Sequence, residues 1–424
     1  MFDFIDMDFD PAATLPSAGP YLPDAADCMR CGLCINTCPT FRLFQTPEET
    51  PRSRIRTLSK ILVENQPITD AERLHLDNCL QCRACETVCP SRMAYGELFD
   101  QAQAHLAAAP QGLAKLAFCL IENKRWRRRL LPLLTLYLKS GVQKPLRHIG
   151  LLKKLHLEDA NALLTRPALK PLAAHYPATG AAQGQVALFT GCIAEHFDNA
   201  TLQAAIQLLN AIGYAVIVPP GQGCCGAVHQ HNGQSATGLI ENNINVFNAL
   251  DVEAVLHTAT GCGAMLSEYR HEDAEAADLF KQRLQDISGF LLAHWPDDLH
   301  LQASPEKVAV HEPCSQRNAL KNQQNVYALL AKIPRLEVTP LPDNHLCCGA
   351  GGSYMLSHPD NAGQLRAMKQ QAINGSGVER VVSSNFGCAV FMNAGGGEVV
   401  HPLQLMAGQL AVLPETVLRQ TNIF

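Results

Sequence analysis

The sequence lacks the features that mark membrane-spanning, nucleic-acid-binding and secreted proteins. No apolar stretch reaches the roughly 18 residues that a helix needs to cross a bilayer. The formal net charge is only −5 at pH 7, which gives no reason to expect a nucleic acid as a partner. The first residues, MFDFIDMDFDPAATLP, carry aspartates where a secretion signal needs basic residues before an apolar run. We therefore expect a cytoplasmic protein, either soluble or bound peripherally to the inner face of the cell membrane.

Cysteine, in contrast, is abundant, with 17 residues in a chain of 424. In a reducing compartment, clustered cysteines are better explained as ligands of iron or zinc than as halves of disulfide bridges. All of them except Cys119 fall into recognisable motifs. Cys119 stands alone and is predicted to be a small buried apolar residue. The cysteine groups, more than any shift in composition, define the domains of a chain too long for one ordinary core.

Two copies of the motif C-x2-C-x2-C-x3-C-P occupy the segment from Cys28 to Cys89, as CMRCGLCINTCP and CLQCRACETVCP. Three closely spaced thiolates can bind three corners of one [4Fe-4S] cubane, while the fourth cysteine, followed by proline, can ligate the other cluster. Zinc also binds paired C-x2-C motifs, but it needs neither the third cysteine step nor Cys-Pro in both copies. The predicted ligand sets are Cys28, Cys31, Cys34 and Cys89 for one cluster, and Cys79, Cys82, Cys85 and Cys38 for the other.

Helical patterns surround these cysteines. Ile55, Leu58 and Ile61 keep helical spacing, and ELFDQAQAHLAAA is rich in good helix formers. An α-helical ferredoxin-type domain with two [4Fe-4S] clusters is therefore predicted over residues 1–118.

The next segment, 119–184, is basic and rich in leucine. Its part from 119 to 170 has 12 lysines and arginines against 3 acids, a net charge of +9 that leaves −14 for the remainder. The run RWRRRLLPLLTLYLKS has the pattern of a helix on an anionic membrane surface. It fits equally well a helix that packs on the rest of the protein or on a partner. Pro132 is expected to interrupt this helix.

The second half of the chain is an internal duplication. Three pairs of segments match, VALFTGC with VAVHEPC, GCCGAVHQH with LCCGAGGSY, and VLHTATGC with VVSSNFGC. Their cysteines are offset by 122, 123 and 126 residues. Each copy alternates short apolar runs with helical patterns, which is typical of a parallel α/β layer. The predicted fold class is thus α+β multidomain, with the helical ferredoxin domain followed by two α/β Cys-Cys-Gly repeats at 185–302 and 303–424.

The order of these motifs resembles the iron-sulfur subunit of bacterial glycolate oxidase. The likeness spans nearly the whole chain and includes CMRCGLCINTCPT, PRSRIR, HLDNCLQCRACETVCPS, GCCGAV, TATGCGA and HLCCGAGGSYMLSHP. It implies an electron-transfer subunit that takes electrons from FAD-binding flavoprotein partners, which oxidise glycolate to glyoxylate, and passes them toward a quinone. No catalytic residue is expected on this chain, and no G-x-G-x-x-G motif of the dinucleotide-binding type is found in it.

Related families share parts of this plan and supply the alternatives. The chain could instead serve a lactate or an anaerobic glycerol-3-phosphate dehydrogenase, or be a heterodisulfide reductase-like enzyme. Heterodisulfide reductase-like repeats with noncubane clusters end in C-x-x-C, whereas Cys262 and Cys388 have no cysteine three residues later. The missing fifth thiolate argues against that chemistry.

The repeat cysteines can nevertheless hold additional centres, because four thiolates suffice for an iron-sulfur cluster or zinc. Reduced, buried thiols with a structural role are the alternative. His311 and His345, close to these cysteines in sequence, could contact a centre or be ordinary core histidines, and Gly226 and Gly349 could provide positive φ angles. The candidate ligands are Cys192, Cys224, Cys225 and Cys262 in the first repeat, and Cys314, Cys347, Cys348 and Cys388 in the second.

Overall fold

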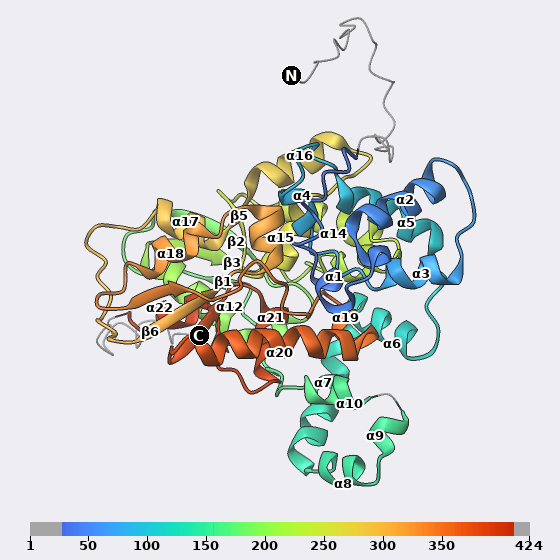
Figure 1. Cartoon of the computed structure of the whole chain (residues 1–424). Helices are drawn as coiled ribbons and strands as arrows, with labels where there is room; N and C mark the ends of the chain where they lie inside the picture. Colours follow the sequence, from blue (N-terminus) through green and yellow to red (C-terminus); the bar gives the residue numbers. More distant parts are fainter. Residues whose placement is uncertain (1–27, 156, 411–424) are drawn as a thin grey trace, which may run out of the picture.

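The computed structural model describes residues 28–155 and 157–410, and Figure 1 shows their arrangement. The acidic N-terminal segment, for which the sequence argues against a secretion signal, lies outside the described residues. In the described part of the chain, no helix is long and apolar enough to cross a membrane.

The N-terminal region is helical, as the sequence predicts. Thr50 caps the second helix by accepting a hydrogen bond from the backbone of Ser53, and Pro51 occupies its first turn. Thr69 and Glu72 form a reciprocal capping box at the third. The helices are α1 (Pro39–Phe44), the 3-10 turn η2 (Pro47–Glu49), α2 (Pro51–Leu62), α3 (Asp70–Asp77), α4 (Ala84–Thr87) and α5 (Tyr95–Leu106). They pack around a small core of their own that contains Leu58, Leu98 and Phe99.

The basic segment that follows forms more helices, and all of them except the first lie in a lobe at the bottom of Figure 1. They are α6 (Gly112–Glu122), α7 (Lys124–Ser140), α8 (Gln143–His148), α9 (Leu151–Lys154) and α10 (Glu158–Ala162). Two expectations are wrong here. Pro132 lies inside α7 without ending it, because it sits on the exposed face, where water can bind the carbonyl that it leaves free. Cys119 is exposed on α6 and not buried.

Each Cys-Cys-Gly repeat contains a parallel sheet. In the first repeat the strand order is β1-β3-β2-β4-β5, with only β1 antiparallel, and in the second it is β7-β6-β8-β9. The strands are β1 (His175–Tyr176), β2 (Gly184–Phe189), β3 (Tyr214–Ile217), β4 (Val255–His257), β5 (Leu284–Asp286), β6 (Lys307–His311), β7 (Glu337–Pro340), β8 (Arg380–Ser383) and β9 (Val399–Val400). The order of the four parallel strands is the same in both copies, which is the arrangement that a duplication produces.

Helices connect these strands. Those of the first repeat are α11 (Ala194–Phe197), α12 (Asn199–Ala211), α13 (Ala227–His231), α14 (Thr237–Asn248), α15 (Thr260–Ser267), α16 (Ala274–Arg283) and α17 (Ile287–Ala293). Those of the second are the π-helical turn η3 (Ser315–Leu320), α18 (Gln324–Leu330), α19 (Tyr354–Ser357), α20 (Pro359–Gly375), α21 (Phe386–Asn393) and α22 (Pro402–Ala407).

The alternation of side chains along the strands divides the interior into distinct cores. Val186 and Leu188 of β2 join Val308 and Val310 of β6 in one apolar core that both repeats share. The intervening side chains point to the opposite faces, where each repeat packs its own cysteines. The cysteine-bearing core of the second repeat also includes Leu80 of the N-terminal region. The ferredoxin-type region therefore packs directly against the second repeat.

Candidate metal centres

The first four-cysteine group surrounds a small hollow at one end of the N-terminal region. Cys28, Cys31, Cys34 and Cys89 line it together with Cys85 of the neighbouring group, and Cys31 is exposed. Burial, followed by the nearby thiols of Cys28, Cys31 and Cys89, raises the pKa of Cys34 to about 11. The chain thus brings the fourth cysteine of the second motif to the first three cysteines of the first motif.

The second group surrounds an adjacent hollow and lies deeper. Cys38 meets Cys79, Cys82 and Cys85 there. Burial raises the pKa of Cys82 well above its usual value, and the next contribution comes from the Cys314 thiol of the second repeat. Cys38 reaches this hollow because α1 begins directly after it, at Pro39, and leads the chain away from the first group. This is the exchange of fourth cysteines that the motif spacing predicts.

A buried arginine stands beside the second group. Arg54 of α2 is 2% exposed, donates from Nη1 to the Cys38 sulfur at 3.6 Å, and donates from Nε to the carbonyl of His75 at 2.7 Å. It also pairs with the buried carboxylate of Glu49. A buried cation in this position offsets the negative charge of thiolates gathered in a low-dielectric interior. Arg54 belongs to the segment PRSRIR, which contributes to the family resemblance, but the sequence alone does not predict a role for this arginine.

The first repeat gathers four cysteines at the carboxyl ends of its parallel strands. Cys192 follows β2, the Cys224–Cys225 pair follows β3, and Cys262 lies in α15 directly after β4. The Cys224 thiol, followed by burial, raises the pKa of Cys192 well above its usual value, and the guanidinium of Arg127 opposes that rise. Ligand groups at the carboxyl ends of parallel strands converge in one crevice.

The second repeat repeats this arrangement. Cys314 follows β6, the Cys347–Cys348 pair follows β7, and Cys388 lies in α21 after β8. The Cys347 thiol and burial raise the pKa of Cys314 well above its usual value. Protonated thiols bind metal only by releasing their protons, so occupation of either crevice would be linked to pH.

Each crevice also has a buried basic side chain. Arg127 of α7 lies beside the first, donates to the carbonyl of Leu120 at 3.0 Å, and leaves its Nε without a partner among the described residues. Lys369 of α20 lies beside the second and donates to the carbonyl of Asp343. Both are at least nine-tenths buried. Among the described residues, a buried basic side chain therefore lies beside a group of thiols in three places, and the cysteine motifs themselves do not predict it.

The backbone conformation explains why a glycine follows each Cys-Cys pair. Gly226 has φ +90° and Gly349 has φ +93°, a region that other residues rarely adopt. The backbone N–H of each donates to the sulfur two residues earlier, Cys224 at 3.4 Å and Cys347 at 3.5 Å. The turn thus directs one amide at one thiol in the same way in both copies.

The two candidate histidines are not equivalent. His345 is partly exposed, and its nearest acid is Asp343. His311 is 1% exposed and lies with Cys348 and Cys388, the ligand atoms of all three being within 4.8 Å of one another. Among the described residues, it is the one group of three or more histidine, cysteine or acidic ligand atoms that lie this close to one another.

Known protein families account for these motifs. A model described as a 4Fe-4S dicluster domain matches residues 24–93, and one described as a cysteine-rich domain matches residues 186–267 and 308–393. A Bacillus subtilis protein named "Probable glycolate oxidase iron-sulfur subunit" is 34% identical over 395 residues, which are 87% of this chain and 88% of that protein. This chain belongs to the glycolate oxidase iron-sulfur subunits. A glycolate oxidase iron-sulfur subunit of Escherichia coli K12 is 32% identical over 89% of this chain and 92% of its own length.

More distant proteins share part of the plan or only the fold. Lactate utilization protein A of Bacillus subtilis is 27% identical over 50% of this chain and 91% of its own length. A hypothetical protein from Helicobacter pylori has a similar structure, with a TM-score of 0.50 at 10% identity over 88% of this chain and 70% of that one. The predicted fold class and family resemblance are confirmed. As a glycolate oxidase iron-sulfur subunit, the chain is an iron-sulfur subunit of an oxidoreductase.

Proposed function

We propose that this chain carries electrons from a flavoprotein partner, which holds FAD and oxidises glycolate to glyoxylate, to a quinone. The single observation that supports this best is the pair of adjacent four-cysteine hollows, the second of which borders the second Cys-Cys-Gly repeat. This arrangement suits an electron relay, because the first hollow adjoins the second and the second adjoins the cysteines of the second repeat. The names of the relatives supply the substrate.

In this proposal the first hollow holds one [4Fe-4S] cluster through Cys28, Cys31, Cys34 and Cys89, and the second holds another through Cys79, Cys82, Cys85 and Cys38. When bound, such clusters accept and release single electrons. The residues fit the group, since each hollow is lined by the four thiols of its set and the first also by Cys85, and Arg54 offsets charge at the second. The exposed end, at Cys31, suits the exchange of electrons with another protein.

We further propose that the repeat crevices hold additional iron-sulfur or zinc centres, through Cys192, Cys224, Cys225 and Cys262, and through Cys314, Cys347, Cys348 and Cys388. Four converging thiols and a buried cation in each crevice support this assignment. The domain boundaries at residues 118, 184 and 302 remain part of the proposal. The helix α6 extends beyond the first of them.

The lobe of α7 to α10 is proposed to place the protein on the surface of an anionic membrane, close to a quinone. Trp126, Leu133 and Leu136 of α7 and Ile149 are between 49% and 68% exposed, beside the exposed Arg125 and Arg129. Leu131 is buried on another side of α7, and Lys124 and Arg128 pair with Glu195 of the first repeat. Sedimentation with vesicles tests the idea, because binding to neutral and anionic vesicles alike, or to neither, would contradict it.

The relay itself is tested with Cys82→Ser in the complete complex. We expect loss of glycolate-dependent quinone reduction, by at least about 100-fold, with reduction of an artificial dye by the flavoprotein retained, because only the path beyond the flavin is broken. Cys119→Ser is the matched control, since this exposed cysteine belongs to no group. Unchanged quinone reduction in Cys82→Ser would disprove the relay. So would disulfide reduction by the isolated chain without any flavoprotein.

A further inference from the structure

The second repeat contains a histidine where the first has none. His311 is the last residue of β6, and its neighbour across the sheet is Ser383, the last residue of β8. Ring nitrogen Nδ1 lies 3.0 Å from the Ser383 hydroxyl. Within the described part of the chain, no hydrogen bond is found for the other ring nitrogen, Nε2. A buried imidazole with one nitrogen held and the other free has the usual arrangement of a metal ligand.

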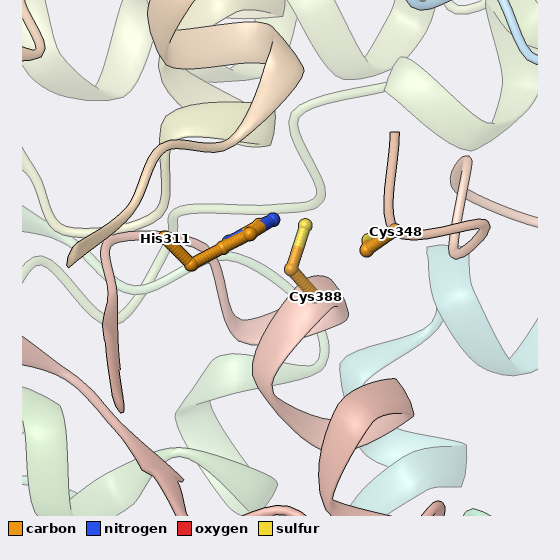
Figure 2. A group of neighbouring side chains, drawn as sticks. All are labelled: His311, Cys348 and Cys388. Carbon is orange, nitrogen blue, oxygen red and sulfur yellow. The ribbon is translucent and has the colours of Figure 1, made fainter. Parts of the chain in front are cut away.

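The free edge of the ring faces two thiols. Figure 2 shows His311 extending toward Cys388, with Cys348 approaching the same space from a different loop. The ligand atoms of all three lie within 4.8 Å of one another, and all three residues are buried. Two thiolates at about 2.3 Å from a tetrahedral ion are about 3.8 Å apart, so small side-chain movements would suffice to close this group on a metal.

In the first repeat, β2 and β4 pair in the same register as β6 and β8, but the residues at the last paired position differ. There Phe189 of β2 pairs with His257 of β4, at the positions of His311 and Ser383. Phe189 offers no ligand atom. His257 is buried beneath Gly263, with Nδ1 4.0 Å from Asp286, and is part of no ligand group among the described residues. The two copies therefore agree in all four cysteines and differ in the imidazole.

We propose that His311 Nε2, with the thiolates of Cys348 and Cys388, ligates a transition metal in the second repeat, and that Cys314 or Cys347 completes the site. The inference rests on the additional centre of the proposed function and names a non-cysteine ligand for it. Imidazole and thiolate together select iron or zinc over hard cations. In this site the ring would donate its Nδ1 hydrogen to the Ser383 hydroxyl, 3.0 Å away, and Nε2 would bind the metal.

The proposed second-repeat site lies next to the second N-terminal cysteine group, where it could accept electrons from that cluster. Asn318 of η3 donates to the backbone carbonyl of Cys82 at 2.7 Å and joins the second repeat to the second cysteine group. If iron occupies the site, replacing thiolate by neutral imidazole removes a negative charge and raises the reduction potential, as in other histidine-ligated clusters. An iron centre here would therefore have a higher reduction potential than the same centre with four thiolates.

The test uses the full chain purified without oxygen, with iron and zinc measured per chain. In the wild type we expect metal beyond the about eight irons of two cubanes. If that metal is iron, pulsed EPR should detect ¹⁴N coupling of a bound imidazole, and if it is zinc, X-ray absorption should detect nitrogen beside sulfur in its first shell.

Two exchanges between the repeats sharpen the test. His311→Phe inserts the first-repeat residue and should lose the metal of the second-repeat site together with its nitrogen signal, while metal bound by the first repeat stays. His257→Ser, which places the second-repeat residue at the corresponding position of the first repeat, should keep both. His311→Cys should keep metal and lose only the nitrogen signal, which separates ligation from misfolding.

Some results would overturn this proposal without touching the relay. About eight irons with no zinc in the wild type would do so, as would extra metal without nitrogen coordination or a nitrogen signal that persists in His311→Phe. Fewer than about eight irons in a folded wild type would instead contradict the two N-terminal clusters. The two proposals therefore fail on different measurements.

Discussion

The two Cys-Cys-Gly repeats share strand order, cysteine positions and glycine conformation, yet they face different surroundings. Helix α6 covers the thiols of the first through Ile121, and Arg127 of α7 lies beside them. The thiols of the second lie against Leu80 and Cys82 of the ferredoxin-type region. Duplication thus supplied two similar crevices, and only one of them adjoins the second cysteine group.

The difference in ligands follows the difference in position. His311, which can act as a metal ligand, occurs in the repeat that contacts the ferredoxin-type region, whereas the corresponding residue of the other repeat is Phe189. A duplicated fold can keep its backbone while its copies diverge in single side chains, because strand register fixes where a side chain points and not what it is. The predictions below compare equivalent changes in the first and the second repeat.

The largest difference in stability is expected from alanine at the two positive-φ glycines. Gly349→Ala should lower the free energy of unfolding by more than Gly226→Ala, each costing on the order of 1–3 kcal/mol for the backbone conformation alone. The added Cβ at Gly349 would meet the backbone oxygen of Ala362 at 2.6 Å, whereas at Gly226 it would meet the side chain of Ala236 at 2.8 Å. A backbone carbonyl in α20 cannot yield without moving the helix.

Chemical denaturation of both variants under anaerobic conditions measures this difference, with Gly238→Ala as a control at a glycine that has open space around it. Equal losses, or a greater loss in Gly226→Ala, would show that the two turns do not differ as described.

A smaller difference is expected between the hydrogen bonds that connect the ferredoxin-type region to each repeat. Asn318→Ala removes the bond to the Cys82 carbonyl and leaves that buried acceptor without this partner, at a cost of about 1–3 kcal/mol. Gln81→Ala removes a bond to the carbonyl of His231 in the first repeat, at 2.9 Å, and should cost about 0.5–1.5 kcal/mol. Hydrogen exchange of residues 79–89 should be faster in the first variant. Faster exchange in Gln81→Ala than in Asn318→Ala would show that the hydrogen bond to the first repeat is the stronger of the two, and would contradict the prediction.

A further difference concerns pH and the first repeat alone. Burial raises the pKa of Asp198 from 3.8 to about 7, while the residue 122 positions later is Leu320, which does not titrate. Because the folded state holds this proton more tightly than the unfolded chain, the contribution is fully present below about pH 4 and is lost as the pH rises through 7. Stability of the wild type relative to Asp198→Asn should therefore fall between pH 4.5 and 7.5. A flat or rising difference would contradict the shifted pKa.

Much of this architecture follows from local sequence. The strands that precede Cys192 and Cys314 are short apolar runs, and the cysteines that follow them reach the carboxyl edge of each sheet as expected. Cys119 and Pro132 were predicted wrongly for a common reason. Exposure depends on which face of a helix the rest of the protein covers, and α6 and α7 are covered on one side only.

By itself, the sequence determined the two cysteine motifs, the duplication and the family, because these depend on spacing along one chain, and it predicted the exchange of the fourth cysteines. Only the tertiary structure decided which repeat lies against Cys82, which buried cations accompany the thiols, and which histidine joins them. In sequence, Arg54 lies 16 residues from Cys38 and Lys369 lies 19 residues from Cys388, and no local pattern connects them. The closeness of His311 to Cys314 marked it as a candidate together with His345, but its contact with Cys348, 37 residues away, depends on packing. Packing brings such groups together, since a buried charge or imidazole is stable only where a partner for it is also buried.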